Sequence, residues 1–196
     1  MQQRHANFRN QAIQVATQCI EANGLSGLNA RFVARSIGCS VGTLYNIFKN
    51  IDFLVFEVNL NTLTQLHEAL TTAIESKNSP EQAIHAIAQA YIQFSMNHQN
   101  LWLTLFEHRF SNPANVPQDY KEKRGFLFQL LETQFALLNP EATAQTIVLE
   151  SRAFWAGVHG LCSLYHNDKL SDDGQSIQDI ANTLIQKFTA SPRSQV

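Results

Sequence analysis

Three residues near position 40 combine chemical groups that suit the recognition of a nucleic acid. Ser40 can cap a helix, which leaves the first backbone N–H groups and the positive end of the helix dipole facing a phosphate or a base edge. Gly42 has no side chain and would let a duplex approach the backbone closely. Thr43 can offer its methyl group to thymine or its hydroxyl to a base edge. Together they favour contact with double-stranded DNA.

Two short helices joined by a tight turn would position these residues. Asn29 can cap a helix over residues 29–37, residues 38–40 form a Gly-containing turn, and a second helix follows over 41–48. This is the helix-turn-helix arrangement, in which the second helix enters the major groove. The same spacing also occurs in helical corners that bind no DNA, so spacing alone leaves both interpretations open.

The charge distribution separates the first quarter of the chain from the rest. The 196 residues carry a net charge of only −2, which argues against a uniformly basic nucleic-acid-binding protein. Residues 1–50, however, hold five basic residues and one acidic residue, a net charge of +4, and the remainder has a net charge of −6. A basic head on an acidic body is the charge pattern expected of a DNA-binding protein.

A longer pattern runs through about residues 7 to 56. Its members are Arg9, Ile13, Ala16, Gly24, Val33-Ala34, Ile37-Gly38 and, above all, Ser40-Val41-Gly42-Thr43-Leu44-Tyr45-Asn46-Ile47-Phe48. This pattern resembles the DNA-binding domain of the tetracycline-repressor (TetR) family, and its most specific part is Gly-Thr-Leu-Tyr followed by Phe48. The resemblance implies that Tyr45 contacts a DNA phosphate. We expect Leu44 and Phe48 to pack on Phe32 and Ile37 instead.

Two positions depart from the family pattern. Ile47 stands where the family usually has an aromatic residue or histidine, and Ile51 replaces a lysine that meets a phosphate. Lys49 and the backbone N–H groups beginning at Asn50 could take over that contact, and otherwise the DNA affinity is weaker than the resemblance implies. The candidate DNA-binding residues are Arg31, Ser40, Val41, Gly42, Thr43, Tyr45, Lys49 and Asn50.

The whole chain has helical periodicity, and no segment alternates convincingly with a period of two. We predict an all-α fold of about nine helices, near residues 7–22, 29–37, 41–48, 50–75, 80–97, 99–109, 119–138, 141–166 and 177–188. Residues 1–50 would form a three-helix DNA-binding domain of the helix-turn-helix type. Residues 51–190 would form a helical ligand-binding and dimerisation domain, and residues 191–196 a disordered tail.

Aromatic residues are concentrated in the middle of the chain, where nine of the 19 fall within residues 91–135. Such residues at helical spacing can be plain core or can line an apolar effector cavity oriented by a few polar groups. The candidate cavity residues are Phe94, His98, Trp102, Phe106, Phe110, Phe126, Leu130 and Trp155. The TetR resemblance further implies that effector binding moves the fourth helix and respaces two DNA-reading heads.

The eighth helix predicts a dimer. It is apolar nearly all round between Ala153 and Tyr165, so it must be covered on two sides. With the last helix it could form a two-fold, four-helix interface, for which the candidates are Ala153, Ala156, Gly157, Gly160, Leu164, Ile177, Leu184 and Phe188. Trp155 followed by His159-Gly160 also resembles the signature of one C-terminal TetR subgroup.

Two other classes of protein compete with a regulator. Seven histidines in a helical body could belong to a metal-binding or enzymatic bundle, but the chain has no paired Glu-x-x-His and no His-Glu-x-x-His, and His159 and His166 alone make a weak metal site. A helical adaptor that binds a partner helix would need neither an effector cavity nor the surface of residues 40–45. We therefore predict a DNA-binding regulator without enzymatic activity, cofactor or metal. The most specific form of this prediction is a homodimeric repressor that a small, largely apolar effector releases from a palindromic operator.

The cysteines and the absence of a long apolar run indicate the cellular compartment of the protein. Cys19, Cys39 and Cys162 are widely spaced, which favours a reducing environment without disulfides. No run of about 20 apolar residues is present to span a membrane, and the first residues lack an apolar signal segment. We expect a cytoplasmic protein that binds double-stranded DNA and a small molecule, with no membrane partner.

Overall fold

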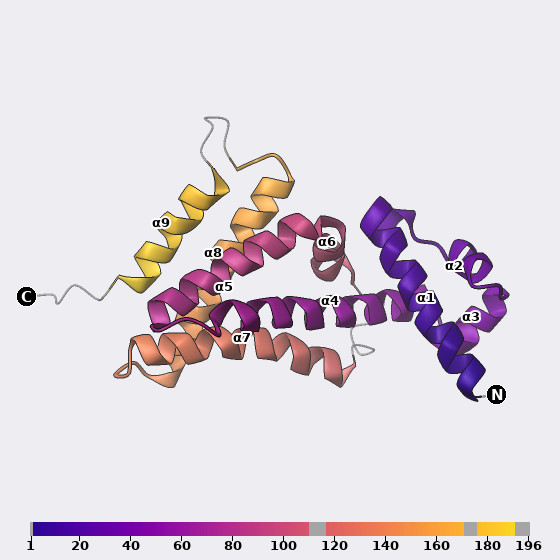
Figure 1. Ribbon diagram of the computed structural model, residues 1–196, viewed down its shortest axis with the longest axis horizontal. Coiled ribbons are helices and arrows are strands. Elements are labelled where there is room, and N and C mark those ends of the chain that lie inside the picture. The colour runs from indigo at the N-terminus through magenta and orange to yellow at the C-terminus, as the bar shows by residue number, and fades with distance from the viewer. Residues whose placement is uncertain (1, 110–116, 171–175, 191–196) are drawn as a thin grey trace, which may run out of the picture. The chain divides into compact units, whose positions relative to one another are not determined.

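The computed structural model describes residues 2–109, 117–170 and 176–190, and within these ranges it contains helices and no strand (Figure 1). The prediction of an all-α chain with nine α-helices is confirmed for this part of the chain. The helices are α1 (Gln2–Asn23), α2 (Ala30–Ser36), α3 (Val41–Phe48), α4 (Ile51–Ile74), α5 (Pro80–Asn97), α6 (Gln99–Glu107), α7 (Gln118–Leu138), α8 (Ala144–His166) and α9 (Ile177–Thr189).

The limits of α2 and α3 follow from their caps. The Asn29 side chain accepts a hydrogen bond from the Phe32 N–H at 2.9 Å, and the Ser40 hydroxyl accepts one from the Thr43 N–H at 3.0 Å. Each cap satisfies a backbone N–H that has no partner inside its helix. Both predicted caps are confirmed, and they fix two short helices on either side of residues 37–40.

Two local features differ from the predicted boundaries. Gly24 ends α1 with a φ of 70°, a backbone conformation that glycine adopts without strain, and a short 3-10 turn, Leu25–Gly27, follows it that the periodicity did not predict. Helix α8 begins at Ala144 rather than near 141, because the Thr143 hydroxyl caps it by accepting from the Thr146 N–H at 3.1 Å.

The chain forms two compact units, each built from two separate segments. The first unit contains residues 1–65 and 98–123, and the second contains residues 66–97 and 124–196. Helices α4 and α7 therefore each contribute to both units. The functional boundary at residue 50 stays a prediction, and the tail at residues 191–196 lies outside the described residues.

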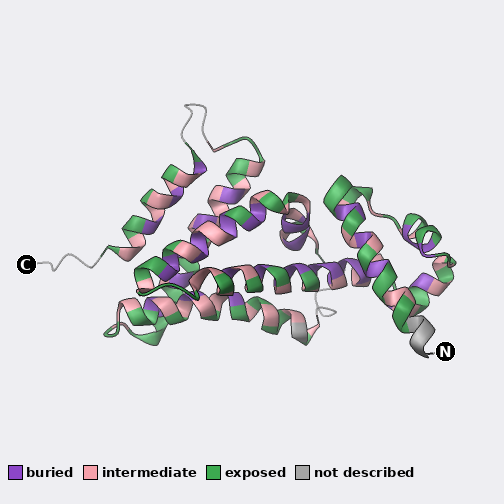
Figure 2. Ribbon diagram, in the orientation of Figure 1, coloured by how far each residue is buried: buried purple, intermediate pink, exposed green. Residues whose placement is uncertain are grey.

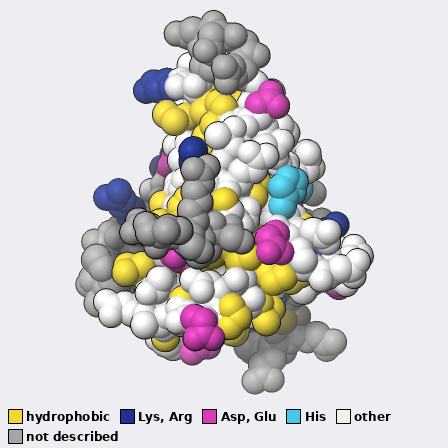
Figure 3. Space-filling view, turned by 90° about the vertical axis from the view of Figure 1, so that its left-hand side faces the viewer, with side chains coloured by type: hydrophobic (Ala, Val, Ile, Leu, Met, Phe, Trp, Pro, Cys, Tyr) yellow, Lys and Arg dark blue, Asp and Glu magenta, His cyan; other side chains and the backbone are white. Residues whose placement is uncertain are grey.

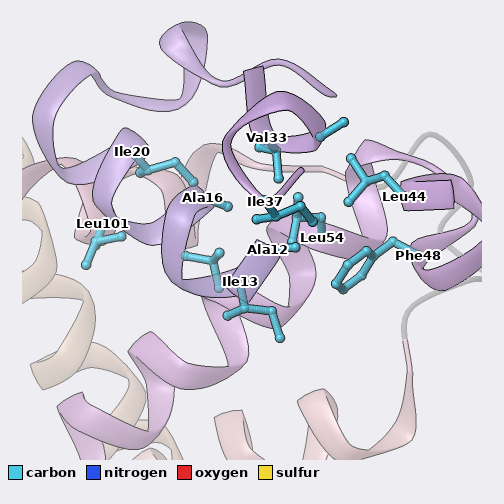
Figure 4. Close-up of a cluster of buried hydrophobic side chains, with 12 residues drawn as sticks. Ala12, Ile13, Ala16, Ile20, Val33, Ile37, Leu44, Phe48, Leu54 and Leu101 are labelled. Carbon is cyan, nitrogen blue, oxygen red and sulfur yellow. The ribbon is translucent and has the colours of Figure 1, made fainter. Parts of the chain in front are cut away.

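The core of the first unit joins the two short helices to α1, α4 and α6. In Figure 4, Leu44 and Phe48 of α3 point towards the buried side chains of the neighbouring helices. Leu54 of α4 and Leu101 of α6, exposed by 0% and 1%, belong to the same cluster. The hydrophobic core that supports α3 therefore extends well beyond the first 50 residues.

One predicted core contact is wrong. Phe32 is 38% exposed, so it does not hold α3 as we expected. Val33, which is fully buried, belongs to this core together with Ile37. The reason is the helical period of α2, which directs residues 33, 34 and 37 to one side and residue 32 away from it.

The second unit is held together by packing among α5, α8 and α9, whose buried residues are purple in Figure 2. Helix α7 joins this core through Phe135. The Phe135 ring lies 5.6 Å from that of Phe154 and 6.4 Å from that of Phe188, with the rings edge to face. This geometry suits aromatic pairs, because the positive ring edge meets the negative ring face. In the described part of the chain, no helix is both long and apolar enough to cross a membrane.

Candidate nucleic-acid interface and effector cavity

The first turn of α3 presents a polar, open surface. The Ser40 hydroxyl lies 2.9 Å from the Thr43 hydroxyl in addition to capping the helix. Gly42 is exposed, and a Cβ atom built on it would meet only the Ser40 hydroxyl oxygen, at an ordinary 3.7 Å. The packing of the chain therefore does not require glycine at this position.

Helix α3 is buried on one side and exposed on the other. Leu44 and Phe48 are 1% and 4% exposed, whereas Tyr45 is 38% exposed and Val41 is half-buried. We call Ser40, Gly42, Thr43 and Tyr45 the recognition surface. The structure thus brings these four predicted DNA contacts together on the same short helix and its cap.

The junction between α3 and α4 is tightly bonded. Lys49 has a φ of 64°, its N–H donates to the Tyr45 carbonyl at 2.8 Å, and its ammonium group lies 5.1 Å from the centre of the Phe53 ring. The Asn50 side chain caps α4 by accepting from the Phe53 N–H at 3.2 Å. The Asn50 N–H itself donates to the Phe48 carbonyl at 2.7 Å. An anion site at the start of α4 therefore does not include this N–H, and DNA contact by Asn50 stays a prediction.

The basic residues of the head have different roles. Arg9 forms an ion pair with Glu57 of α4, and its guanidinium lies 5.9 Å from the centre of the Phe48 ring, so its charge is compensated within the first unit. Arg31 and Arg35 are exposed and one helical turn apart on α2. With Lys49, they supply the positive charge around the recognition surface.

Figure 3 shows one face of the molecule on which basic side chains do not gather. Among the described side chains on the face in Figure 3, lysine and arginine (dark blue) lie apart from one another, with acidic and hydrophobic groups between them. No row of basic side chains is visible on this face, as the net charge of −6 on residues 51–196 leads one to expect.

Both ends of α6 are bonded to other helices of the first unit, the first end to α1 and the last to α4. The Asn100 amide donates to the Glu21 carbonyl at 2.8 Å, and the Glu21 carboxylate lies 3.7 Å from His98 Nδ1. After the last turn of α6, His108 Nε2 lies 3.4 Å from the Asp52 carboxylate of α4. His98, which we predicted as a polar group of the cavity, thus contacts α1.

A small cavity lies within the second unit. Its volume is about 20 Å³, room for roughly one water molecule. Its lining residues come from α4, α5, α7 and α8, and they are Leu70, Ile87, Ala88, Tyr91, Leu127, Leu131, Phe154, Trp155 and Val158. Seven of these nine side chains are hydrocarbon, and none carries a charge. The cavity therefore suits an uncharged, apolar occupant.

The structure divides the predicted cavity residues between the two units. Trp155 lines the cavity described above, while His98, Trp102 and Phe106 belong to the first unit, where the Trp102 and Phe106 rings are 5.1 Å apart. The remaining positions in the second unit are buried Phe94, half-buried Leu130 and Phe126, which is 47% exposed. Phe110 lies outside the described residues. Contact of these residues with an effector stays a prediction.

Two of the lining residues, Tyr91 and Trp155, contact His159, which does not itself line the cavity. The Tyr91 hydroxyl lies 2.9 Å from His159 Nδ1, and the His159 ring stacks on that of Trp155 with centres 5.0 Å apart. Trp155 also contacts Phe128 edge to face at 5.3 Å. The Arg152 guanidinium lies 3.5 Å from the centre of the Phe128 ring. Burial lowers the pKa of His159, which favours its neutral form.

The predicted dimer residues fall into two groups. In α9, Ile177 is buried, Phe188 packs on Phe154, and Leu184 packs on Gly157, where a Cβ atom would come within 2.9 Å of a Leu184 methyl carbon. These residues hold α9 against the rest of the second unit. The other predicted residues, Ala153, Ala156, Gly160 and Leu164, lie on α8, and together with Leu149, which the prediction did not include, we call them the α8 outer face. Their contact with a second copy stays a prediction.

The sequence is similar to those of known transcriptional regulators. Residues 84–188, more than half of the chain, match the family described as "Tetracyclin repressor-like, C-terminal domain". The HTH-type transcriptional repressor KstR2 of Mycolicibacterium smegmatis is 24% identical over 121 residues, which are 61% of this chain and 58% of that protein. The chain thus spans less than two thirds of that relative.

Solved structures agree with the fold. A protein of unknown function from Rhodococcus sp. RHA1 superposes with a TM-score of 0.78 at 19% identity, covering 93% of both chains. The transcriptional regulator FadR from Bacillus subtilis, solved in complex with stearoyl-CoA, superposes with a TM-score of 0.69 at 17% identity, covering 92% of this chain and 97% of that one.

Proposed function

The chain belongs to the tetracycline-repressor family, and we propose on this basis that it is a homodimeric, DNA-binding transcriptional repressor without enzymatic activity. We propose further that a small, largely apolar effector releases it from a palindromic operator. The observation that carries this proposal is the recognition surface, where a capped helix start, an exposed glycine and a partly exposed tyrosine lie together on α3. The similarity to the repressor KstR2 supports it.

The chemistry of this surface supports DNA as the partner. The start of α3 carries the positive end of its helix dipole, and Gly42 leaves the backbone there open to close approach. Arg31, Arg35 and Lys49 can neutralise phosphates, whose counterions are then released. Specificity would come from groups of α3 that reach base edges in the major groove.

Operator binding tests the proposal directly. Selection from random duplexes should yield a short palindrome whose affinity falls steeply as salt rises, because phosphate contacts release counterions. Tyr45→Phe and Thr43→Ala should each weaken binding about tenfold by removing a hydrogen-bonding hydroxyl, while leaving the dimer intact. Fluorescence anisotropy across a salt series measures both effects.

The matched control is Tyr120→Phe, which removes the same hydroxyl from a half-buried residue beside Phe56. It should bind the selected duplex as the unchanged protein does. If no duplex is enriched, or if binding ignores salt, a helical adaptor that recognises another protein becomes the better description.

The α8 outer face supports dimerisation. Leu149 and Leu164 are 62% and 44% exposed, and the other residues of this face, Ala153, Ala156 and Gly160, are small, so a second α8 could approach closely. An exposed apolar helix face of this kind is typical of an interface. Because most homodimers are two-fold symmetric, the same face of a second copy is the expected partner.

Gly160→Glu should disrupt this dimer. No atom lies within 4 Å of a Cβ built on Gly160, so the fold tolerates a side chain, whereas two carboxylates placed in a two-fold apolar interface would repel each other and lose hydration. We expect a shift from dimer to monomer and at least a tenfold weaker dimer, measured by light scattering after size exclusion. Gly125→Glu, made at another glycine with open space around its Cβ, should stay dimeric.

The cavity supports an apolar effector. Its volume of about 20 Å³ is far below the roughly 300–1,000 Å³ of typical ligand pockets, so an effector has to push the lining side chains apart. Helix α4 supplies Leu70 to the cavity and Leu54 to the core of the first unit, which makes it the continuous element that an effector would move. Stearoyl-CoA in the similar FadR structure likewise has a long apolar chain.

A further inference from the structure

We infer that Tyr91 and His159 form the polar anchor of the cavity and select a neutral, apolar ligand that carries one hydroxyl group. The inference rests on the proposed effector role of this cavity and adds the chemical class of its ligand. It starts from the contrast between a lining that is almost entirely hydrocarbon and the hydroxyl of one lining residue, Tyr91, which is hydrogen-bonded to His159.

The lining determines what cannot be buried there. None of the nine side chains is charged, so a carboxylate or ammonium inside the cavity would lose its hydration without gaining an opposite charge. The part of a ligand that enters the cavity is therefore uncharged. Its body should be aliphatic or aromatic, to match Leu70, Leu127 and Phe154.

The polar pair determines which polar group the ligand carries. Tyr91 Oη and His159 Nδ1 are 2.9 Å apart, and either atom donates the proton, depending on the imidazole tautomer. A ligand hydroxyl both donates and accepts, so it can join the pair in either arrangement. A ketone or an ether only accepts, and it would require one tautomer. A hydroxyl group is thus the best complement to this anchor.

The neighbouring rings keep the anchor in place. His159 stacks on Trp155 with an angle of 18° between the rings, and Trp155 itself lines the cavity. Burial lowers the pKa of His159, so the imidazole is neutral near pH 7 and presents no charge to the ligand. Trp155 can also report ligand binding, because the fluorescence of its indole ring changes when a ligand lies against it.

The test compares cyclohexanol with methylcyclohexane, two probes of nearly equal size that differ by a hydroxyl and a methyl group. Binding is followed by the fluorescence of Trp155 in a Trp102→Phe background, since the chain has only two tryptophans. In Tyr91→Phe, the ratio of the cyclohexanol affinity to the methylcyclohexane affinity should fall about tenfold, the value of one hydrogen bond. The affinity for methylcyclohexane should stay within threefold.

Two further variants complete the comparison. His159→Phe keeps a ring beside Trp155 but removes Nδ1, and it should lower the same ratio at least threefold. Tyr120→Phe, in the first unit, should leave the ratio unchanged. Circular dichroism establishes that each variant is folded. A ratio that changes less than threefold in Tyr91→Phe, or no binding of either probe up to its solubility limit, would overturn the inference.

Release from DNA is measured separately, so that the two proposals can fail independently. If the Tyr91-dependent preference is present but neither probe nor any larger alcohol changes operator affinity, the anchor stands and the effector role of the cavity is wrong. If the chain binds no DNA, the fluorescence assay still reports on the anchor, because it contains no duplex.

Discussion

Replacing Gly42 by glutamate should abolish operator binding while leaving the chain folded and slightly more stable. Within the chain, a Cβ at this position meets only the Ser40 hydroxyl at 3.7 Å, and the side chain would project from an exposed position. A carboxylate in the first turn of α3 interacts favourably with the helix dipole, and glutamate has a higher helix propensity than glycine. Both effects raise the free energy of unfolding, by about 1 kcal/mol together.

The same carboxylate acts in the opposite direction on DNA. It would lie where we propose that the duplex approaches most closely, and like charges placed together cost several kcal/mol. In the proposed dimer the substitution is present twice, so we expect operator affinity to fall at least about 100-fold. Electrophoretic mobility shift or anisotropy measures the binding, and urea unfolding followed by circular dichroism measures the stability.

Gly125→Glu is the matched control, because it adds the same charge at a glycine of α7 with nothing within 4 Å of its Cβ. It should change operator affinity less than threefold. Should Gly42→Glu bind the operator as tightly as the unchanged protein, α3 does not enter the groove by its first turn.

Among the substitutions proposed here, Leu54→Ala is expected to reduce stability the most, lowering the free energy of unfolding by about 3 kcal/mol. Leu54 is fully buried in the cluster that also contains Leu44, Phe48 and Leu101. Truncation removes apolar contacts and leaves a cavity that the surrounding helices cannot fill completely. Urea unfolding measures the loss, and hydrogen exchange should show faster opening of the amides in α1, α2 and α3.

Leu137→Ala provides the comparison, because Leu137 is 60% exposed and its truncation should cost less than about 0.5 kcal/mol. A small effect of Leu54→Ala would mean that Leu54 contributes less to this core than its burial indicates. Because Val58 and Leu101 also belong to this cluster, we expect residues 1–50 alone not to form a stable fragment.

Local sequence signals predicted the elements that carry the recognition surface. Asn29 and Ser40 are strong capping residues, and each forms the expected bond to the N–H three residues later. Leu44 and Phe48 are one turn apart and are both buried. These predictions succeed because capping and helical period act over three or four residues, which is the range that a single sequence reveals.

The cavity could not be predicted in the same way. Its lining comes from four helices, and the sequence does not reveal which aromatic residue faces which core. Trp102 and Trp155 look alike in the sequence, yet the first belongs to the first unit and the second lines the cavity. Tyr91 was visible as one of the clustered aromatics, but its pairing with His159, 68 residues away, is a tertiary contact.

The sequence also does not reveal which charged residues are paired within the chain or which glycines contact another part of it. Arg9 adds to the basic count of the head, but its partner Glu57 lies outside the first 50 residues. Gly157 and Gly160 form one small-residue pattern, yet Gly157 accommodates Leu184 within the chain while Gly160 faces open space. A sequence pattern identifies small residues on a helix and does not distinguish an internal neighbour from an external one.

The composition of the core around Leu101 has a consequence for building hybrid regulators with exchanged operator specificity. A graft cut at residue 50 would transfer α3 without Leu54, Val58 and Leu101, which complete its hydrophobic core. The transplanted helices would then meet foreign side chains from two separate places in the recipient sequence. A functional hybrid has to carry both segments of the first unit, so new specificity is more readily obtained by substitutions on the exposed side of α3 than by recombination at the end of that helix.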